Sequence, residues 1–214
     1  MPKNKQPEWD RFFEKAVKDV LSPNSKVLDI GAGLRIDSSR GNEEDSGRAW
    51  IKPLIKDVTY HVMDQVDTYH PDFVGDIMSM PFEDESYDSI ICLAVLEHVP
   101  RPWDAMSEMF RVLKPGGKIF VYVPFLSPYH AMPGYYGDYF RYTEDGIRSL
   151  CEKFTNLKIA PVRGPIETLA HLLPGKFDSN FIRMIGRKLD GLRKSSGKQV
   201  SGYNFTATKP HVIS

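Results

Sequence analysis

The sequence lacks a long hydrophobic run and an excess of charge of either sign. No window approaches the roughly 18 apolar residues that a membrane-spanning helix needs, and the first residues, MPKNKQPEWDRFF, contain no apolar signal segment. Lys plus Arg number 28 and Asp plus Glu also number 28, so no global field would draw the chain to nucleic acid or to a membrane. We therefore expect a soluble, cytoplasmic protein.

Cysteine is scarce as well, and no closely spaced pair of cysteines offers a zinc site. The two that occur, Cys92 and Cys151, lie far apart in apolar stretches, which predicts buried free thiols and a reducing compartment. Hydrophobic residues make up 41% of the chain, as in a globular core. A length of 214 residues suits one α/β domain and is short for two, so we expect residues 1–214 to form a single domain.

Hydrophobic periodicity predicts helices alternating with strands. Residues 1–25 contain an amphipathic helix, and further helical stripes run through residues 103–113 and 147–154. Apolar or alternating runs predict strands at KVLDI, VTYHVMD, SYDSIICLAV, KIFVYVPF, NLKIAPV and GYNFTATK. Strands that alternate with helices indicate a doubly wound α/β domain, with helices on both faces of a parallel sheet.

Three segments interrupt this alternation. Residues 35–50 hold seven charged side chains and predict an exposed, mobile loop. Residues 124–143 form a polar, aromatic loop after the fifth strand, and residues 166–195 predict a helical insertion before the last strand. Within and just after that insertion, residues 183–198 carry six basic residues and one acid over an apolar stripe. A packed helix with a solvated basic face is the preferred interpretation; an anionic membrane, an anionic substrate, an active-site cap or a dimer contact are alternatives.

The turn after the first strand, Gly31-Ala32-Gly33, predicts a ligand site. In open α/β sheets ligands bind at the carboxyl ends of the strands, and glycine allows a tight turn and close approach of a ligand. Glycine kept for packing alone is the other interpretation. A dinucleotide fingerprint would need a third glycine where Ile36 stands, and the Gly-Lys-Ser/Thr ending of a phosphate-binding loop is missing. A ligand with a pyrophosphate is therefore disfavoured.

Two acids favour an adenosine-bearing ligand. Asp64 ends the second strand, where a carboxylate can accept hydrogen bonds from both ribose hydroxyls. Asp76 follows the third strand and can accept from an adenine amino group, with Ile77 and Met78 flanking the ring. Each acid alone could be a solvated turn residue, but both follow successive strands in order.

The succession VLDIGAG, YHVMDQVD, GDIMSMPFEDESYDSIICLAVLEHV and EMFRVLKPGGKIFVYVPF resembles the class I S-adenosylmethionine-dependent methyltransferases, and within them the small-molecule group with LEHV and RVLKPGG segments. The resemblance covers residues 26–125 and, more loosely, extends to residue 209. It implies a Rossmann-like, seven-stranded, mostly parallel sheet with an antiparallel last strand. It also implies S-adenosyl-L-methionine as cofactor and S-adenosyl-L-homocysteine as product, and a cofactor without phosphates explains the missing phosphate fingerprints.

The resemblance implies a set of cofactor-binding residues along the strand ends: Asp29, Gly31, Ala32, Gly33, Asp64, Gln65, Asp76, Ile77, Leu93 and Ala94. The glycine turn would face the methionine moiety, Asp64 the ribose, and Leu93 and Ala94 the sulfonium. Gln65, Asp76 and Ile77 would surround the adenine.

Two features depart from the pattern of this family. Arg35 stands where the family has a glycine, so the loop after Gly33 is expected to take a different path. The interval from Gly33 to Asp64 also exceeds the usual spacing of about 20 residues between glycine loop and acid. Residues 35–50 absorb the excess, either as a mobile edge of the active site or as a solvated insertion.

Methyl transfer from a sulfonium is a direct displacement, in which the enzyme positions the nucleophile and excludes water. A general base helps only where the nucleophile arrives protonated. His130 is the first candidate for that base because an imidazole titrates near neutrality. His98 is the second candidate for the base. It is at least as compatible with a structural role, in which it orients the turn after the fourth strand. No metal ion is expected.

The loop 124–143 supplies the candidate acceptor-binding residues Tyr129, Asp138, Tyr139 and Arg141. Tyrosine and arginine offer stacking surface and directed hydrogen bonds, which suit a hydroxylated or anionic small molecule. The pattern H-x-x-P…D-Y-F-R-Y-T resembles methyltransferases of bacterial cell-surface glycan pathways. That resemblance implies a sugar or sugar-nucleotide hydroxyl as acceptor.

Three rival functions remain for comparison. A base-modifying nucleic-acid methyltransferase would carry Asn/Asp-Pro-Pro-aromatic after the fourth strand, where this chain has LAVLEHV, so no nucleic-acid partner is expected. A dehydrogenase is disfavoured by the missing third glycine. A cofactor-binding protein without turnover stays open because of Arg35 and the long loop. The sequence is compatible with a monomer or a homodimer.

Overall fold

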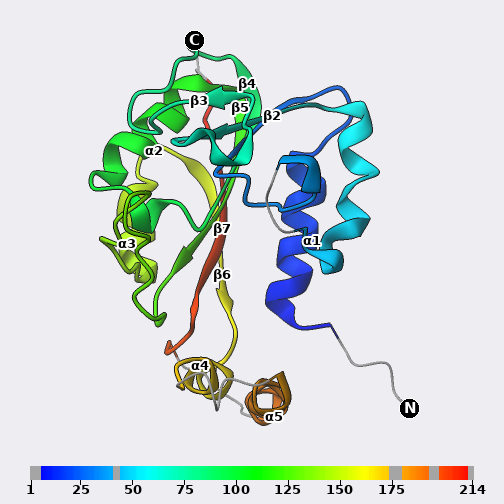
Figure 1. The fold of residues 1–214 in the computed structure, drawn as a ribbon, viewed down its shortest axis with the longest axis vertical. Coiled ribbons are helices and arrows are strands. Elements are labelled where there is room, and N and C mark those ends of the chain that lie inside the picture. Colours follow the sequence, from blue (N-terminus) through cyan, green and yellow to red (C-terminus); the bar gives the residue numbers. More distant parts are fainter. Residues whose placement is uncertain (1–5, 41–43, 174–179, 193–197, 212–214) are drawn as a thin grey trace.

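The computed structural model describes residues 6–40, 44–173, 180–192 and 198–211. It is built on a seven-stranded sheet of order β3-β2-β1-β4-β5-β7-β6 (Figure 1). The strands are β1 Lys26–Ile30, β2 Thr59–Asp64, β3 Phe73–Val74, β4 Tyr87–Leu93, β5 Leu113–Pro124, β6 Thr155–Val162 and β7 Gly202–Thr208. The pairs among β1 to β5 are parallel, and β7 runs antiparallel to both β5 and β6. The predicted fold class is thereby confirmed.

Helices cover both faces of the sheet, because neighbouring residues of a strand point to opposite sides. Figure 1 shows α1 (Glu8–Val20) on one side, and α2 (Pro102–Val112) and α3 (Glu144–Leu150) on the other. Consecutive residues of β4 illustrate the division: Ile91 packs in the cluster under α1, whereas Ile90 packs in the cluster that includes Met109 of α2. A sheet that is buried on both faces needs near-continuous apolar strands, as the sequence has.

Most described residues of the segment 35–50 are exposed, as expected, but the segment also contacts α1. It contains short 3-10 turns at Ser38–Arg40 and Ser46–Ile51, and residues 41–43 lie outside the described residues. Ile36 is buried in the α1 cluster, and the guanidinium of Arg48 lies over the ring of Phe13, 4.9 Å from its centroid. The described part of this segment therefore packs against α1.

The insertion before the last strand contains α4 (Pro165–His171) and α5 (Asn180–Gly191), which lie together at one end of the molecule (Figure 1). Positions 174–179 and 193–197 lie outside the described residues. Gly186 brings the two helices close, since a Cβ there would come within 2.9 Å of the Cα of Glu167. Arg187 also pairs with Glu167 at 2.6 Å.

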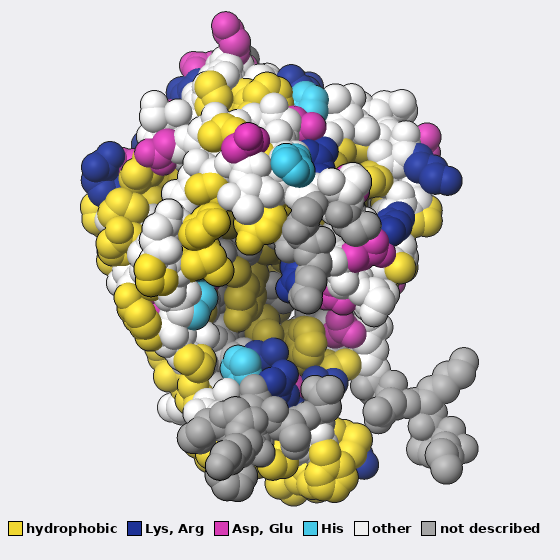
Figure 2. All heavy atoms as spheres, viewed as in Figure 1, with side chains coloured by type: hydrophobic (Ala, Val, Ile, Leu, Met, Phe, Trp, Pro, Cys, Tyr) yellow, Lys and Arg dark blue, Asp and Glu magenta, His cyan; other side chains and the backbone are white. Residues whose placement is uncertain are grey.

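The apolar stripe of α5 is exposed, which corrects the preferred interpretation of a stripe packed inward. The helix packs by its Gly186 side instead, and Phe181 and Leu192 are 65% and 80% exposed. Figure 2 shows apolar side chains gathered at the α4–α5 end of the molecule. The stripe consists of Phe181, Ile185, Leu189 and Leu192.

The structure tests what the sequence predicts for the two cysteines and for membrane-spanning helices. Cys92 and Cys151 are buried free thiols, as predicted. Burial raises the pKa of both, so neither is poised as a nucleophile. In the described ranges, each helix is too short or too polar to cross a bilayer.

Replacing Phe120 by Ala is expected to lower the free energy of unfolding by about 3–5 kcal/mol, because it opens a cavity between α1 and the sheet. Phe120 is fully buried in β5, and its ring meets that of Phe13 edge-to-face, with 5.4 Å between centroids. Urea denaturation followed by circular dichroism measures the change. Trp103→Ala, at a 54% exposed position of α2, is the control and should cost less than about 1 kcal/mol. Equal losses in the two variants would contradict this packing.

Candidate functional site

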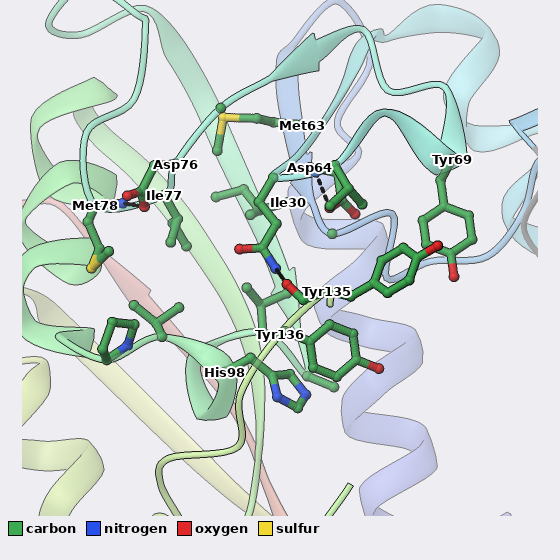
Figure 3. Close-up of a pocket in the computed structure, with 18 residues that line it drawn as sticks. Ile30, Met63, Asp64, Tyr69, Asp76, Ile77, Met78, His98, Tyr135 and Tyr136 are labelled. Carbon is green, nitrogen blue, oxygen red and sulfur yellow. Dashed lines mark hydrogen bonds between the residues drawn. The ribbon is translucent and has the colours of Figure 1, made fainter. Parts of the chain in front are cut away.

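A cavity of about 270 Å³ opens at the carboxyl ends of β1, β2 and β4 (Figure 3). This edge is where ligands bind in open α/β sheets, and the volume is near the lower end for a small-molecule site. Its lining comes from the strand ends, from the segments that follow them and from one turn of the loop 124–143: Ile30, Gly31, Met63, Asp64, Gln65, Val66, Tyr69, Gly75, Asp76, Ile77, Met78, Ala94, Val95, His98, Val99, Pro100, Tyr135 and Tyr136.

Six of the predicted cofactor residues line this cavity. They are Gly31, Asp64, Gln65, Asp76, Ile77 and Ala94. Asp29, Ala32, Gly33 and Leu93 are absent from the lining. The structure thus gathers six of the ten predicted residues at one cavity, and their contact with a cofactor stays a prediction.

The two acids at the cavity are held by their own turns. Asp64 accepts a hydrogen bond from the amide of Val66 at 3.2 Å, and Asp76 accepts one from the amide of Met78 at 2.8 Å. Burial raises the pKa of Asp64, against the opposing effect of the amides of Val66 and Gln65. A half-buried carboxylate that faces a cavity is suited to hydroxyl donors of a ligand, because each oxygen can accept more than one hydrogen bond.

The two glycines of the turn serve different purposes. Gly31 has φ +80° and lines the cavity, and a Cβ on it would come within 2.6 Å of Val95. A Cβ on Gly33 would come within 2.7 Å of the Cβ of Leu93. Gly33 and Leu93 therefore pack the turn against the end of β4, so the packing interpretation holds for Gly33.

Behind the turn lies Asp29, a fully buried carboxylate. Its two oxygens accept hydrogen bonds from the amides of Gly33 and Leu34, each at 3.2 Å, and from the hydroxyl of Tyr60. On the other side of the same turn, Arg48 donates to the carbonyl of Gly33 at 2.6 Å. Burial raises the pKa of Asp29 to about 6, although its hydrogen bonds, Tyr60 first, oppose the shift. Asp29 and Arg48 thus fix the turn from both sides.

Arg35 closes the turn that follows Gly33. It has φ +51°, in the left-handed region that glycine adopts most readily. Its amide donates to the carbonyl of Ala32 at 3.1 Å and closes the turn. Arg35 therefore holds a backbone conformation that glycine adopts most readily, and a different path of the loop from that of the family stays a prediction.

The turn after β4, Leu96–His98, carries an acid that the sequence analysis did not single out. Glu97 is 1% exposed, and burial raises its pKa to about 7. Its backbone carbonyl accepts from the amide of Tyr139 at 2.7 Å, which ties the turn to the loop 124–143. His98 donates from Nδ1 to the carbonyl of Gly137 at 2.6 Å, and burial lowers the pKa of His98.

His130 lies next to His98, although it does not line the cavity. The two imidazole rings meet edge-to-face with 4.8 Å between centroids. The Nδ1 of His130 lies 3.0 Å from the carbonyl oxygen of Pro128. The structure therefore brings the two predicted catalytic candidates together, with only His98 on the cavity wall.

The predicted acceptor-binding residues lie outside the cavity lining. Arg141 makes five hydrogen bonds within the loop: two to the carboxylate of Asp138 and one each to the carbonyls of Ser127, Pro128 and Phe140. These occupy the five N–H groups of a guanidinium, so Arg141 clamps the loop. Arg141 also holds the pKa of Asp138 well below its usual range. Tyr129 and Tyr139 are mostly exposed, and contact of these four residues with an acceptor stays a prediction.

Two tyrosines of the loop were missed as site residues. The ring of Tyr136 lies 4.2 Å from that of His98, centroid to centroid, and the carbonyl of Tyr135 accepts from Gln65 at 2.9 Å (Figure 3). Both belong to the stretch whose tyrosine content the sequence shows, but the pattern does not tell which of its tyrosines turn inward. Through these two residues the loop closes over the cavity.

Part of the chain is similar to known methyltransferases. Residues 56–121 match the profile of a family described as a methyltransferase domain. Demethylmenaquinone methyltransferase of Renibacterium salmoninarum is 33% identical over 116 residues, which are 53% of this chain and 46% of that protein. Squalene methyltransferase 1 of Botryococcus braunii is 35% identical over 107 residues, or 48% of this chain and 28% of that protein. The chain thus spans less than half the length of each.

Solved structures share the fold. Phosphoethanolamine N-methyltransferase 2 of Haemonchus contortus, solved in complex with S-adenosyl-L-methionine, superimposes with a TM-score of 0.55 at 17% identity. The match covers 92% of this chain and 53% of that one. At this level of identity the likeness concerns the fold.

The buried Asp29 is expected to make stability fall as pH rises from about 4 to about 6. The pKa of Asp29 is near 3.8 in an unfolded chain and about 6 in the fold, so the native state binds the proton more tightly. This tighter binding stabilises the native state by about 3 kcal/mol below about pH 4, and the stabilisation is lost as the pH rises to about 6. The measurement is urea denaturation of wild type and Asp29→Asn across this pH range. The difference between the two should change with pH, whereas Asp57→Asn, at an exposed acid, should parallel wild type. Parallel curves for all three would contradict the assignment.

Proposed function

We propose that this chain is an S-adenosylmethionine-dependent methyltransferase that transfers a methyl group by direct displacement to a small-molecule acceptor. The matched methyltransferase profile, the two named relatives and the fold support the enzyme class and the cofactor. The observation that carries the proposal is one cavity that brings together Gly31, Asp64 and Ala94 from the ends of β1, β2 and β4 and Asp76 from the turn after β3.

The cavity residues fit this cofactor in their chemistry. Asp64 offers a partly desolvated carboxylate to the ribose hydroxyls, and Asp76 with Ile77 and Met78 offers an acceptor and an apolar wall to the adenine. Gly31 and Ala94 leave room for the methionine moiety at the ends of β1 and β4. When bound, S-adenosylmethionine supplies an electrophilic methyl group, whose bond to sulfur breaks with the electron pair left on sulfur.

The acceptor side is formed by His98, Tyr136 and the rest of the loop 124–143. A hydroxyl acceptor must lose its proton as its oxygen bonds to the methyl carbon. His130 is the proposed base, with His98 beside it on the cavity wall. Tyr136 and the apolar residues Val95 and Val99 help to exclude water from the reacting atoms.

Within the small molecules we propose a sugar or sugar-nucleotide hydroxyl as acceptor. The small-molecule class is supported by relatives named for squalene and demethylmenaquinone. The sugar is supported by the H-x-x-P…D-Y-F-R-Y-T resemblance and by the exposed rings of Tyr129 and Tyr139, which can stack on a pyranose. A protein that binds the cofactor without turnover is the second candidate, and no nucleic acid is proposed as partner.

Asp64→Ala is expected to weaken binding of S-adenosylhomocysteine at least tenfold, because two hydroxyl groups of the ribose lose a charged acceptor. Isothermal titration calorimetry measures the dissociation constant. Asp67→Ala, at an exposed acid outside the cavity lining, is the matched control and should bind as wild type does. Unchanged affinity in Asp64→Ala would place the ribose elsewhere.

His130→Ala is expected to keep the affinity for S-adenosylhomocysteine within about twofold, since His130 lies off the cavity lining, and to reduce turnover by about 100-fold or more. The assay follows release of S-adenosylhomocysteine with sugar nucleotides as acceptors, and with a quinone for comparison. Turnover of wild type with none of the acceptors, despite cofactor binding, would favour the second candidate. Full activity of His130→Ala would contradict its role.

A further inference from the structure

Two histidines from separate segments direct their Nε2 atoms toward one buried carboxylate. His98 follows Glu97 directly in the turn after β4, and His130 comes from the loop 124–143. The Oε1 of Glu97 lies 3.9 Å from the Nε2 of His98 and 3.8 Å from the Nε2 of His130. One ligand atom from each of the three residues lies within 4.8 Å of the others.

The partners on the other ring nitrogens fix the tautomers. A carbonyl oxygen can only accept, so the Nδ1 of His98 must donate to Gly137 and the Nδ1 of His130 to Pro128. In the neutral rings the hydrogen then sits on Nδ1, and each Nε2 presents a lone pair toward Glu97. Lone pairs and an ionised carboxylate repel one another unless a shared proton or a cation lies between them.

The spacing leaves room for a positive charge. Distances of 3.8 and 3.9 Å are too long for direct hydrogen bonds. Ligand atoms that share one zinc ion at about 2.0–2.1 Å lie about 3–4 Å apart. In addition, the Oε2 of Glu97 is buried and has no hydrogen-bond partner in the described part of the chain. A buried, unpaired carboxylate oxygen next to two imidazole lone pairs is an incomplete set of ligands.

We propose that Glu97, His98 and His130 bind one divalent transition-metal ion, of which Zn²⁺ is the reference. Two imidazoles and one carboxylate form a ligand set that zinc and non-haem iron sites use, with a further position left open. Ligating histidines commonly donate their second nitrogen to a carbonyl or carboxylate. Here Gly137 and Pro128 supply the carbonyls, and Asp138 lies 3.5 Å from the Nδ1 of His130.

This proposal rests on the proposed function and deepens it. His98 lines the cavity, so the open position of the ion adjoins the acceptor side. There an ion would hold the acceptor oxygen and lower the pKa of its hydroxyl, so that the acceptor would release this proton to the solvent as it binds, before methyl transfer. When the ion is bound, His130 is one of its ligands, and the ion takes over from His130 the activation of the acceptor hydroxyl. The sequence does not reveal this site, because its three ligands come from two distant segments and show no spacing typical of metal ligands.

The test uses untagged full-length protein that has been treated with a chelator and desalted. Calorimetry with Zn²⁺ is expected to give one ion per chain with a micromolar or tighter dissociation constant. Co²⁺ should show the visible absorption of a four- or five-coordinate site. His130→Asn, at a half-exposed position, and Glu97→Gln should each weaken Zn²⁺ binding at least tenfold. His70→Asn, at an exposed histidine outside the cluster, should bind as wild type does.

Binding of S-adenosylhomocysteine by the metal-free protein separates this proposal from the function on which it rests. If S-adenosylhomocysteine binds and Zn²⁺ does not, the metal site is refuted and the proposed methyltransferase function stands. The same conclusion follows if S-adenosylhomocysteine binds and His130→Asn and His70→Asn bind Zn²⁺ equally. If Zn²⁺ binds through Glu97 and His130 but S-adenosylhomocysteine does not bind, the metal site stands and the proposed function fails.

Discussion

The hydrogen bonds that the buried Asp29 accepts determine the shape of the glycine turn that borders the cavity. A carboxylate in the core is costly unless it is hydrogen-bonded, and its partners here are the amides of Gly33 and Leu34 and the hydroxyl of Tyr60. These bonds fold the glycine turn back over the end of β1, and Arg48 fixes the carbonyl side of the same turn. The cavity wall at Gly31 follows from this arrangement, although Asp29 itself never reaches the cavity.

The two halves of the site are built by different means. The half proposed to hold the cofactor consists of strand ends, whose positions are set by the register of β1 with β2 and β4. The acceptor half is a loop, which Arg141 clamps from within and which the carbonyl of Glu97 anchors to the turn after β4. A rigid cofactor half and a separately anchored acceptor half allow one fold to serve many acceptors, which is why the fold leaves the acceptor open.

Local patterns predicted the fold, and they also identified acids that the structure places at one cavity. Apolar runs marked the strands, and Asp64 and Asp76 were recognisable because each follows a strand directly. What failed depended on partners distant in sequence. The burial of Ile36 requires α1, and the inward turn of Tyr136 requires His98, which lies in the turn after β4. The exposed stripe of α5 was missed because periodicity identifies an apolar face but not the element, if any, that covers it.

The central claim is that the cavity at the ends of β1, β2 and β4 holds the adenosyl cofactor. A crystal structure of the protein with S-adenosylhomocysteine tests it most directly. The account predicts the ribose hydroxyls within hydrogen-bonding distance of Asp64, the adenine beside Asp76 and Ile77, and the sulfur next to Ala94. Density for the ligand outside this cavity, or in it with the ribose away from Asp64, would contradict the account.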